Sequence, residues 1–137
     1  MKIVDDRQIE SIATGARVVA VLGANVDPSR PAHYVPAALH RRNVRILPVS
    51  SRFVGEELFG EPVRASLADL REPVDIVDVF RRSSDVAAHL SEILAMDPLP
   101  KVVWLQSGIR DDATADELVK NGIDVVQDRC LMVEARV

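Results

Sequence analysis

The sequence contains a single cysteine, Cys130, and only three histidines. One cysteine excludes a disulfide within the chain, and the scattered histidines lack the spacing of a zinc site, so no metal is expected. No apolar run reaches the roughly 18 residues that a membrane span requires, and the N-terminus lacks the pattern of a secretory signal. These absences favour a cytoplasmic protein that does not associate with a membrane.

The chain also lacks an excess of basic residues. Lysine and arginine number 17 against 21 aspartate and glutamate residues, which gives a formal net charge of −4. Because domains that bind nucleic acid usually carry a basic face, this balance argues against nucleic acid as a partner. The 137 residues, 47% of them hydrophobic, are enough for one domain with its own core over residues 1–137.

Short apolar runs alternate with stretches of helical periodicity along the chain. Runs of this kind are typical of strands that are buried on both faces of a sheet. The pattern predicts strands over 18–22, 44–49, 74–80, 102–106 and 124–127, a short edge strand over 62–65, and helices over 5–14, 31–43, 83–96 and 111–120. The tail over 129–137 has no pattern that predicts an element.

This alternation of strands and helices predicts an α/β fold. Strands separated by helices form parallel sheets with helices on both faces, and their crossovers are right-handed. We therefore expect a three-layer, doubly wound, Rossmann-like parallel sheet of five to six strands, most simply in the order 3-2-1-4-5 with a sixth strand at the edge.

In such a sheet, ligands bind beyond the carboxyl ends of the strands. The loops expected at that edge carry five arginines, and guanidinium groups recognise phosphates well. We therefore expect a site for a polyanionic ligand. The arginines are Arg30, Arg52, Arg81, Arg82 and Arg110.

The loop after the first strand does not match the usual nucleotide motifs. A dinucleotide fingerprint needs three glycines, but Gly23 stands alone, with Asn25 and Pro28 in the other two places. No acidic residue follows the second strand, where Arg52 lies instead, and the Gly-Lys-Ser/Thr of an NTPase is missing. NAD and NTP are disfavoured, whereas a small NADP-dependent oxidoreductase, or another nucleotide-using enzyme, stays as an alternative with Arg52 on the 2′-phosphate.

Five blocks of the sequence resemble a known family: GANVDPSRPAHYV, RILPVS, DIVDVFRR, VVWLQSG and VVQDRC, in that order. They are similar to the small single-domain CoA-binding proteins, whose fold is similar to the N-terminal CoA-binding domain of the succinyl-CoA synthetase alpha subunit. The resemblance implies non-catalytic binding of CoA or an acyl-CoA, by a carrier, sensor or regulator without a catalytic apparatus. It names no protein partner, and a homodimer is compatible with it.

The resemblance also implies which residues contact the ligand. Many relatives have serine in place of Asn25 and of Ala32, so these two positions depart from the family pattern. The implied contacts are Gly23, Ala24, Asn25, Arg30, Pro31 and Tyr34 around the phosphates, Val49, Ser50 and Arg52 beside the adenine and the 3′-phosphorylated ribose, and Phe80, Arg81, Gln106 and Gly108 along the pantetheine arm.

Other residues with reactive side chains are expected to be structural. Asp75 and Asp78 lie three apart on a strand and point to opposite faces, so they cannot act as a catalytic pair, and each needs a hydrogen-bond or ionic partner. Trp104 is expected in the core. Cys130 is expected to be a small buried apolar residue, although its neighbour Arg129 favours a thiolate that could form a mixed disulfide with CoA.

Overall fold

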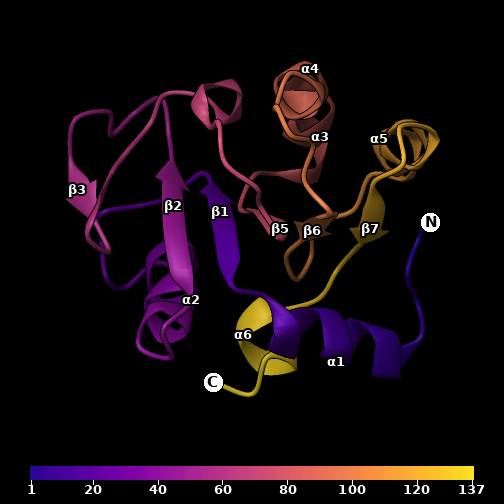
Figure 1. The fold of residues 1–137 in the computed structure, drawn as a ribbon, viewed down its shortest axis with the longest axis horizontal. Coiled ribbons are helices and arrows are strands. Elements are labelled where there is room, and N and C mark those ends of the chain that lie inside the picture. The colour runs from indigo at the N-terminus through magenta and orange to yellow at the C-terminus, as the bar shows by residue number, and fades with distance from the viewer.

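The computed structural model describes residues 1–137 as a sheet between two layers of helices. The sheet has five parallel strands in the order β2-β1-β5-β6-β7. The predicted doubly wound, Rossmann-like fold is confirmed (Figure 1). The strands are β1 (Val18–Leu22), β2 (Arg45–Val49), β5 (Ile76–Val79), β6 (Val102–Leu105) and β7 (Asp124–Val126).

Helices cover both faces of the sheet (Figure 1). On one face lie α1 (Asp6–Gly15), α2 (Pro31–His40) and α6 (Leu131–Glu134). On the other lie α3 (Ser83–Val86), α4 (Leu90–Leu94) and α5 (Asp112–Lys120), with the short 3-10 helices η1 (Leu67–Asp69) and η2 (Ala87–His89).

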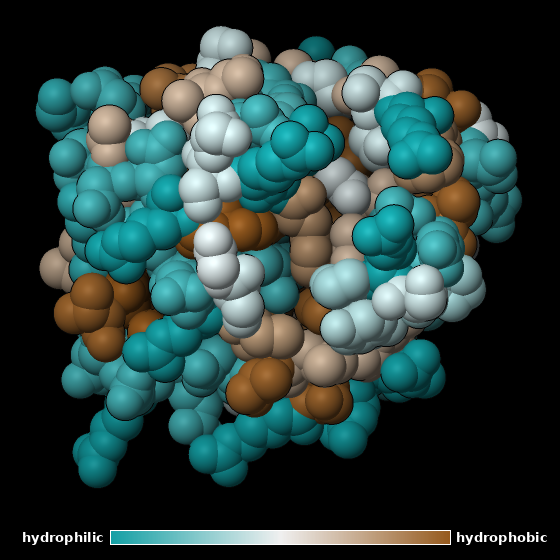
Figure 2. All heavy atoms as spheres, turned by 180° about the vertical axis from the view of Figure 1, so that it is seen from behind, coloured by the Kyte–Doolittle hydropathy of each residue, from teal (hydrophilic) through white to brown (hydrophobic).

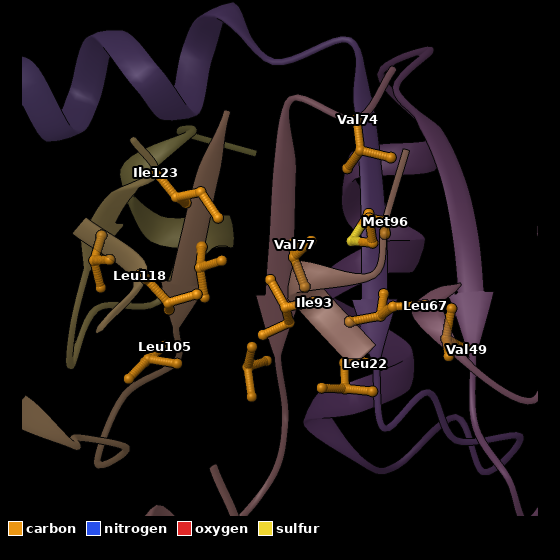
Figure 3. Packing of buried hydrophobic residues seen from close by; sticks show 14 of the residues in the cluster. Leu22, Val49, Leu67, Val74, Val77, Ile93, Met96, Leu105, Leu118 and Ile123 are labelled. Carbon is orange, nitrogen blue, oxygen red and sulfur yellow. The ribbon is translucent and has the colours of Figure 1, made fainter. Parts of the chain in front are cut away.

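Each face of the sheet has its own hydrophobic core. Successive strand residues point to opposite faces, so Val77 joins the core beneath α4 and α5, whereas Ile76 joins the core beneath α1, α2 and α6. Figure 3 shows the first of these cores, where Ile93 and Leu118 from the helical layer meet Val77 and its neighbours. Trp104 is fully buried in the second core, as predicted.

The predicted strand over 62–65 is reduced to one bridge. Arg64 pairs in parallel with Val49 at the outer edge of β2, the place expected for the third strand. The preceding residues form a separate hairpin of β3 (Glu57–Leu58) and β4 (Glu61–Pro62). Its two turn residues, Phe59 and Gly60, both have positive φ (56° and 76°), which is the geometry of a tight two-residue hairpin turn.

Two helical predictions differ from the structure. The helix predicted over 83–96 is three short segments, α3, η2 and α4. The predicted helix over 31–43 ends at His40, because Asn43 takes a positive φ of 67° and directs the chain into β2. The unassigned tail contains α6, which packs against α1 and α2.

The two aspartates next to and within β5 have opposite environments. Asp75 accepts hydrogen bonds from the backbone N–H groups of Arg17 (2.8 Å) and Val18 (3.0 Å) and pairs with Lys101 (3.1 Å). Partial burial acts to raise the pKa of Asp75, but these partners outweigh it and the pKa is lowered. The predicted structural role of Asp75 is confirmed.

Asp78 has none of the partners expected for it. Its side chain is fully buried, and neither carboxyl oxygen has a hydrogen-bond partner. It lies between Val21 and Trp104 of the neighbouring strands, whose side chains belong to the apolar core. Burial raises the pKa of Asp78 well above its usual range, so folding favours the neutral carboxylic acid.

These environments give a pH dependence of opposite sign. Because the pKa of Asp78 is higher in the folded chain than in the unfolded chain, its contribution to stability is fully present below the unfolded pKa of about 4. As the pH rises above that value, this contribution falls by up to about 1.4 kcal/mol per pH unit until the pH passes the folded pKa. We therefore expect Asp78→Asn to become progressively more stable than the wild type from about pH 4 upward, measured by chemical denaturation between pH 3 and 8.

Asp75→Asn is the matched control for that series. The lowered pKa of Asp75 contributes stability above about pH 4 that is lost as pH falls. Asp75→Asn is therefore expected to be destabilised at neutral pH and to approach the wild type in acid. A wild-type advantage over Asp78→Asn that grows with pH would contradict the assignment of Asp78.

Candidate functional site

The turn after β1 brings the carboxyl ends of three strands together. The N–H groups of Gly23 and Ala24 both donate to the carbonyl oxygen of Val49 at the end of β2, at 2.9 and 3.2 Å. Phe80 N–H, at the end of β5, donates to the carbonyl of Leu22 at 2.9 Å. Gly23 has a φ of +89°, and a Cβ built on it would lie 2.6 Å from the Phe80 carbonyl oxygen, so only glycine fits here.

The loop that follows is held by its own polar side chains. Asn25 Oδ1 accepts from Asp27 N–H at 2.9 Å, and Asp27 Oδ1 accepts from the N–H and the hydroxyl of Ser29. The Ser29 N–H is the main reason that the pKa of Asp27 is lowered. His33 Nδ1 donates to the Asn25 carbonyl at 2.8 Å and so ties α2 to the loop.

The largest pocket of the molecule, of about 1050 Å³, opens at this edge of the sheet. Of its 18 lining residues, 8 are hydrophobic, so it suits a ligand with both polar and apolar parts. Seen from behind, the surface is hollowed near its centre, with hydrophobic residues inside and strongly hydrophilic ones around them (Figure 2). We call this pocket of about 1050 Å³ the larger pocket. It is lined by the loop after β1, the first turn of α2, the loops after β5 and β6, and the start of the C-terminal tail.

A smaller pocket of about 420 Å³ adjoins the larger one. Gly23, Asn25, Arg52 and Arg81 line both, and we call these four residues the junction. Beyond the junction, the smaller pocket extends along the loop after β2 toward the η2–α4 segment, where it meets mainly polar residues. These include Ser50, Ser51, Ser66, His89 and Glu92.

The one acidic residue of the smaller pocket is already engaged. Glu92 accepts hydrogen bonds from the Ser66 hydroxyl (2.8 Å), from Leu67 N–H (2.9 Å) and from His89. Partial burial acts to raise the pKa of Glu92, but these bonds outweigh it and the pKa is lowered. Glu92 therefore secures η1 against the η2–α4 segment, a structural task that occupies its carboxylate.

Four of the five predicted arginines line the larger pocket, namely Arg30, Arg52, Arg81 and Arg82. Only Arg81 has a carboxylate partner, Asp85, at 3.9 Å. Arg52 lies over the ring of Phe53, 4.8 Å from its centre. The fifth arginine, Arg110, was wrongly assigned to this cluster, because it pairs with Asp112 at 3.2 Å and borders a different surface pocket.

Most of the other residues nominated from the sequence lie in the same place. Two do not line either pocket. Val49 is fully buried in β2, and Gly108 is exposed, where its N–H donates to Asp128. Those that line one or both pockets are Gly23, Ala24, Asn25, Arg30, Pro31, Tyr34, Ser50, Arg52, Phe80, Arg81 and Gln106.

The C-terminal tail also lines the larger pocket, a contribution that was not predicted from the sequence. Cys130, Met132 and Val133 line the larger pocket from α6 and its first flanking residue. Cys130 is partly exposed rather than buried, and the guanidinium of Arg129 is taken up by Asp6 (2.8 Å) and Glu134 (3.1 Å). A helix of four residues has too few turns for a periodic signal, so the sequence could not reveal it.

No group of three or more histidine, cysteine, aspartate or glutamate side chains could hold a metal ion. None of the helices combines the length and the apolar character that crossing a membrane would require.

Known proteins resemble this chain over nearly its full length. A family model described as "CoA binding domain" matches residues 17–136. The chain is 31% identical over 126 residues to the Bacillus subtilis (strain 168) protein called "Uncharacterized protein YneT", covering 92% of this chain and 90% of that one.

Solved structures are similar as well. One described as "cell-free ID.343 from Thermus thermophilus" is 54% identical, with a TM-score of 0.90 and coverage of 97% of this chain and 98% of that chain. A "hypothetical protein from Pyrococcus horikoshii OT3" is 25% identical, with a TM-score of 0.86 and coverage of 99% and 94%.

The close approach at Gly23 can be tested with three alanine variants. Gly23→Ala combines a positive φ with a contact against backbone, and we expect a loss of at least about 2 kcal/mol in the free energy of unfolding. Gly55, with a φ of +91° and open space around it, isolates the backbone strain and is expected to lose about 1 kcal/mol.

Gly15, at the end of α1 with nothing within 4 Å, is expected to change by less than about 0.5 kcal/mol or to gain slightly. Urea denaturation measures all three. Equal losses at Gly23 and Gly55 would mean that the contact with Phe80 is not limiting.

Proposed function

This chain belongs to the CoA-binding domain family, and we propose that it binds CoA or an acyl-CoA at the carboxyl edge of its sheet without carrying out a reaction on it. The binding protein would then act as a carrier, sensor or regulator of that ligand. The observation that carries the proposal is the cluster of four arginines, three of them without a carboxylate partner, around two joined pockets.

The charge of the cluster suits the ligand. CoA carries a pyrophosphate in its middle and a third phosphate on its ribose, so it presents anionic groups to several guanidinium groups at once. The first turn of α2 adds to this attraction, because Arg30 precedes it and the amino end of a helix favours negative charge.

The shape of the two pockets also suits CoA. CoA has two arms joined by its pyrophosphate, and the two pockets meet at the junction of Gly23, Asn25, Arg52 and Arg81. With the pyrophosphate at the junction, the nucleotide arm fits the polar smaller pocket. The pantetheine arm, with its amide groups and apolar carbons, fits the larger one, whose lining is mixed.

The two departures from the family pattern are compatible with this arrangement. Asn25 uses its carbonyl oxygen within the loop, which leaves its amide NH₂ free to donate to a phosphate. Ala32 lies at the wall of the larger pocket and is 9% exposed, so it contributes contact but no hydrogen bond.

A thermal-shift series tests the choice of ligand. A ligand at about 100 times its Kd stabilises the folded chain by roughly 2.7 kcal/mol, so CoA and acetyl-CoA should each raise the melting temperature while NAD does not. A shift with NADP and none with CoA would instead favour the NADP-dependent enzyme.

Arginine variants test the site. Losing one charge-assisted hydrogen bond costs about 1.5–3 kcal/mol, so Arg30→Ala and Arg52→Ala should each weaken CoA binding by roughly 10- to 100-fold in calorimetric titration. Arg110→Ala is the matched control, because Arg110 is equally cationic but pairs with Asp112 outside both pockets. The affinity of this variant for CoA should be the same as that of the wild type. Equal affinities in all three variants would place the ligand elsewhere.

A further inference from the structure

The larger pocket is lined by the only thiol of the chain. Cys130 lines the larger pocket but not the smaller one, and it follows β7, at the opposite edge of the sheet from β2, whose loop lines the smaller pocket. It is partly exposed and free. Met132, Ile109 and Gln106 line the larger pocket with it, and they too are absent from the smaller pocket.

Cys130 is held in place by the end of β6. On one side of it, the Trp104 indole N–H donates to the Arg129 carbonyl at 2.8 Å. On the other side, the Leu131 N–H donates to Gln106 Oε1 at 2.9 Å. The two buried side chains therefore fix the backbone before and after the cysteine, so the thiol has a defined position in the wall of the pocket.

Gln106 supplies independent evidence that this part of the pocket receives a ligand. Its side chain is only 5% exposed, and its Oε1 is used by Leu131, yet its Nε2 donates to no group of the chain. This Nε2 is not itself buried, because the buried side-chain nitrogen and oxygen atoms without a partner are those of Asp78 alone, so the donor reaches the open space of the pocket. Since Gln106 lines the pocket, a ligand carbonyl there would satisfy the Nε2–H, and the pantetheine arm of CoA carries two amide carbonyls before its thiol.

We propose that Cys130 forms a mixed disulfide with CoA by thiol–disulfide exchange in the larger pocket, an inference that rests on the proposed function. The co-reactant is a disulfide of CoA. The Cys130 thiolate attacks one sulfur of it, the Cys130–CoA bond forms, and the second CoA leaves as a thiolate that takes up the proton lost by Cys130. The cysteine is oxidised and the released CoA is reduced, so no further oxidant is needed.

The binding site makes this exchange selective. A disulfide that carries the CoA nucleotide is held at the arginines while its sulfur lies beside Cys130, which raises the local concentration of the reacting group. A small disulfide that lacks the nucleotide is not bound by the arginines, so its sulfur is not concentrated beside Cys130. CoA disulfide should therefore react with the reduced chain at least about tenfold faster than hydroxyethyl disulfide at equal concentration.

Intact-mass spectrometry of the reduced chain after incubation with CoA disulfide tests the proposal. One CoA should be added per chain, dithiothreitol should remove it, and Cys130→Ser should show no adduct. Desulfo-CoA, which lacks the thiol, should slow the reaction by occupying the pocket. Arg30→Ala should slow it toward the rate of hydroxyethyl disulfide, whereas Arg110→Ala should not.

The outcomes separate the two proposals. If CoA raises the melting temperature of Cys130→Ser but the wild type forms no adduct, or reacts with both disulfides at the same rate, the exchange is overturned and CoA binding stands. If CoA gives no thermal shift with either protein, and CoA disulfide reacts no faster than hydroxyethyl disulfide, both proposals fail.

Discussion

The close approach of Gly23 to the Phe80 carbonyl determines how the edge of the sheet that carries the two pockets is built. It requires a residue without a Cβ and with a positive φ at the end of β1. Two hydrogen bonds to the Val49 carbonyl close the same turn from the other side. The ends of β2, β1 and β5 are thus fixed against one another, and the two pockets meet at this point.

Five of the ten arginines outside the cluster have a carboxylate partner, against one of the four within it. Arg45 contacts both Glu61 and Glu72, and Arg129 contacts both Asp6 and Glu134. In a protein with a net charge of −4, carboxylates are available to neutralise guanidinium groups. Three of the four arginines around the larger pocket have no such partner, so positive charge is concentrated at a cleft. This charge attracts a polyanion.

The sequence predicted the elements that depend on local pattern. Each of the five sheet strands is buried on both faces and so reads as an apolar run, and their order follows from right-handed crossovers. The predicted strand over 62–65 is a single bridge because Glu61 and Pro62 pair with β3 in a hairpin, and the turn of that hairpin needs a positive φ at Phe59 that its identity does not predict. Asp78 was assigned a partner because buried carboxylates usually have one, and only the three-dimensional packing shows that none lies near.

The candidate site was predictable where it depends on the topology of the sheet and hidden where it depends on long-range hydrogen bonds. The loops after the strands were nominated by position alone, whereas the wall around Cys130 exists because Trp104 and Gln106 bond to residues 25 positions later in the chain. Those bonds join the C-terminal tail to the sheet. Because the larger pocket is bounded by the loop after β1 on one side and the tail on the other, a ligand that fills it contacts both. Its binding free energy then contributes to holding the tail in place, so the order of the tail and the occupancy of the site are thermodynamically linked.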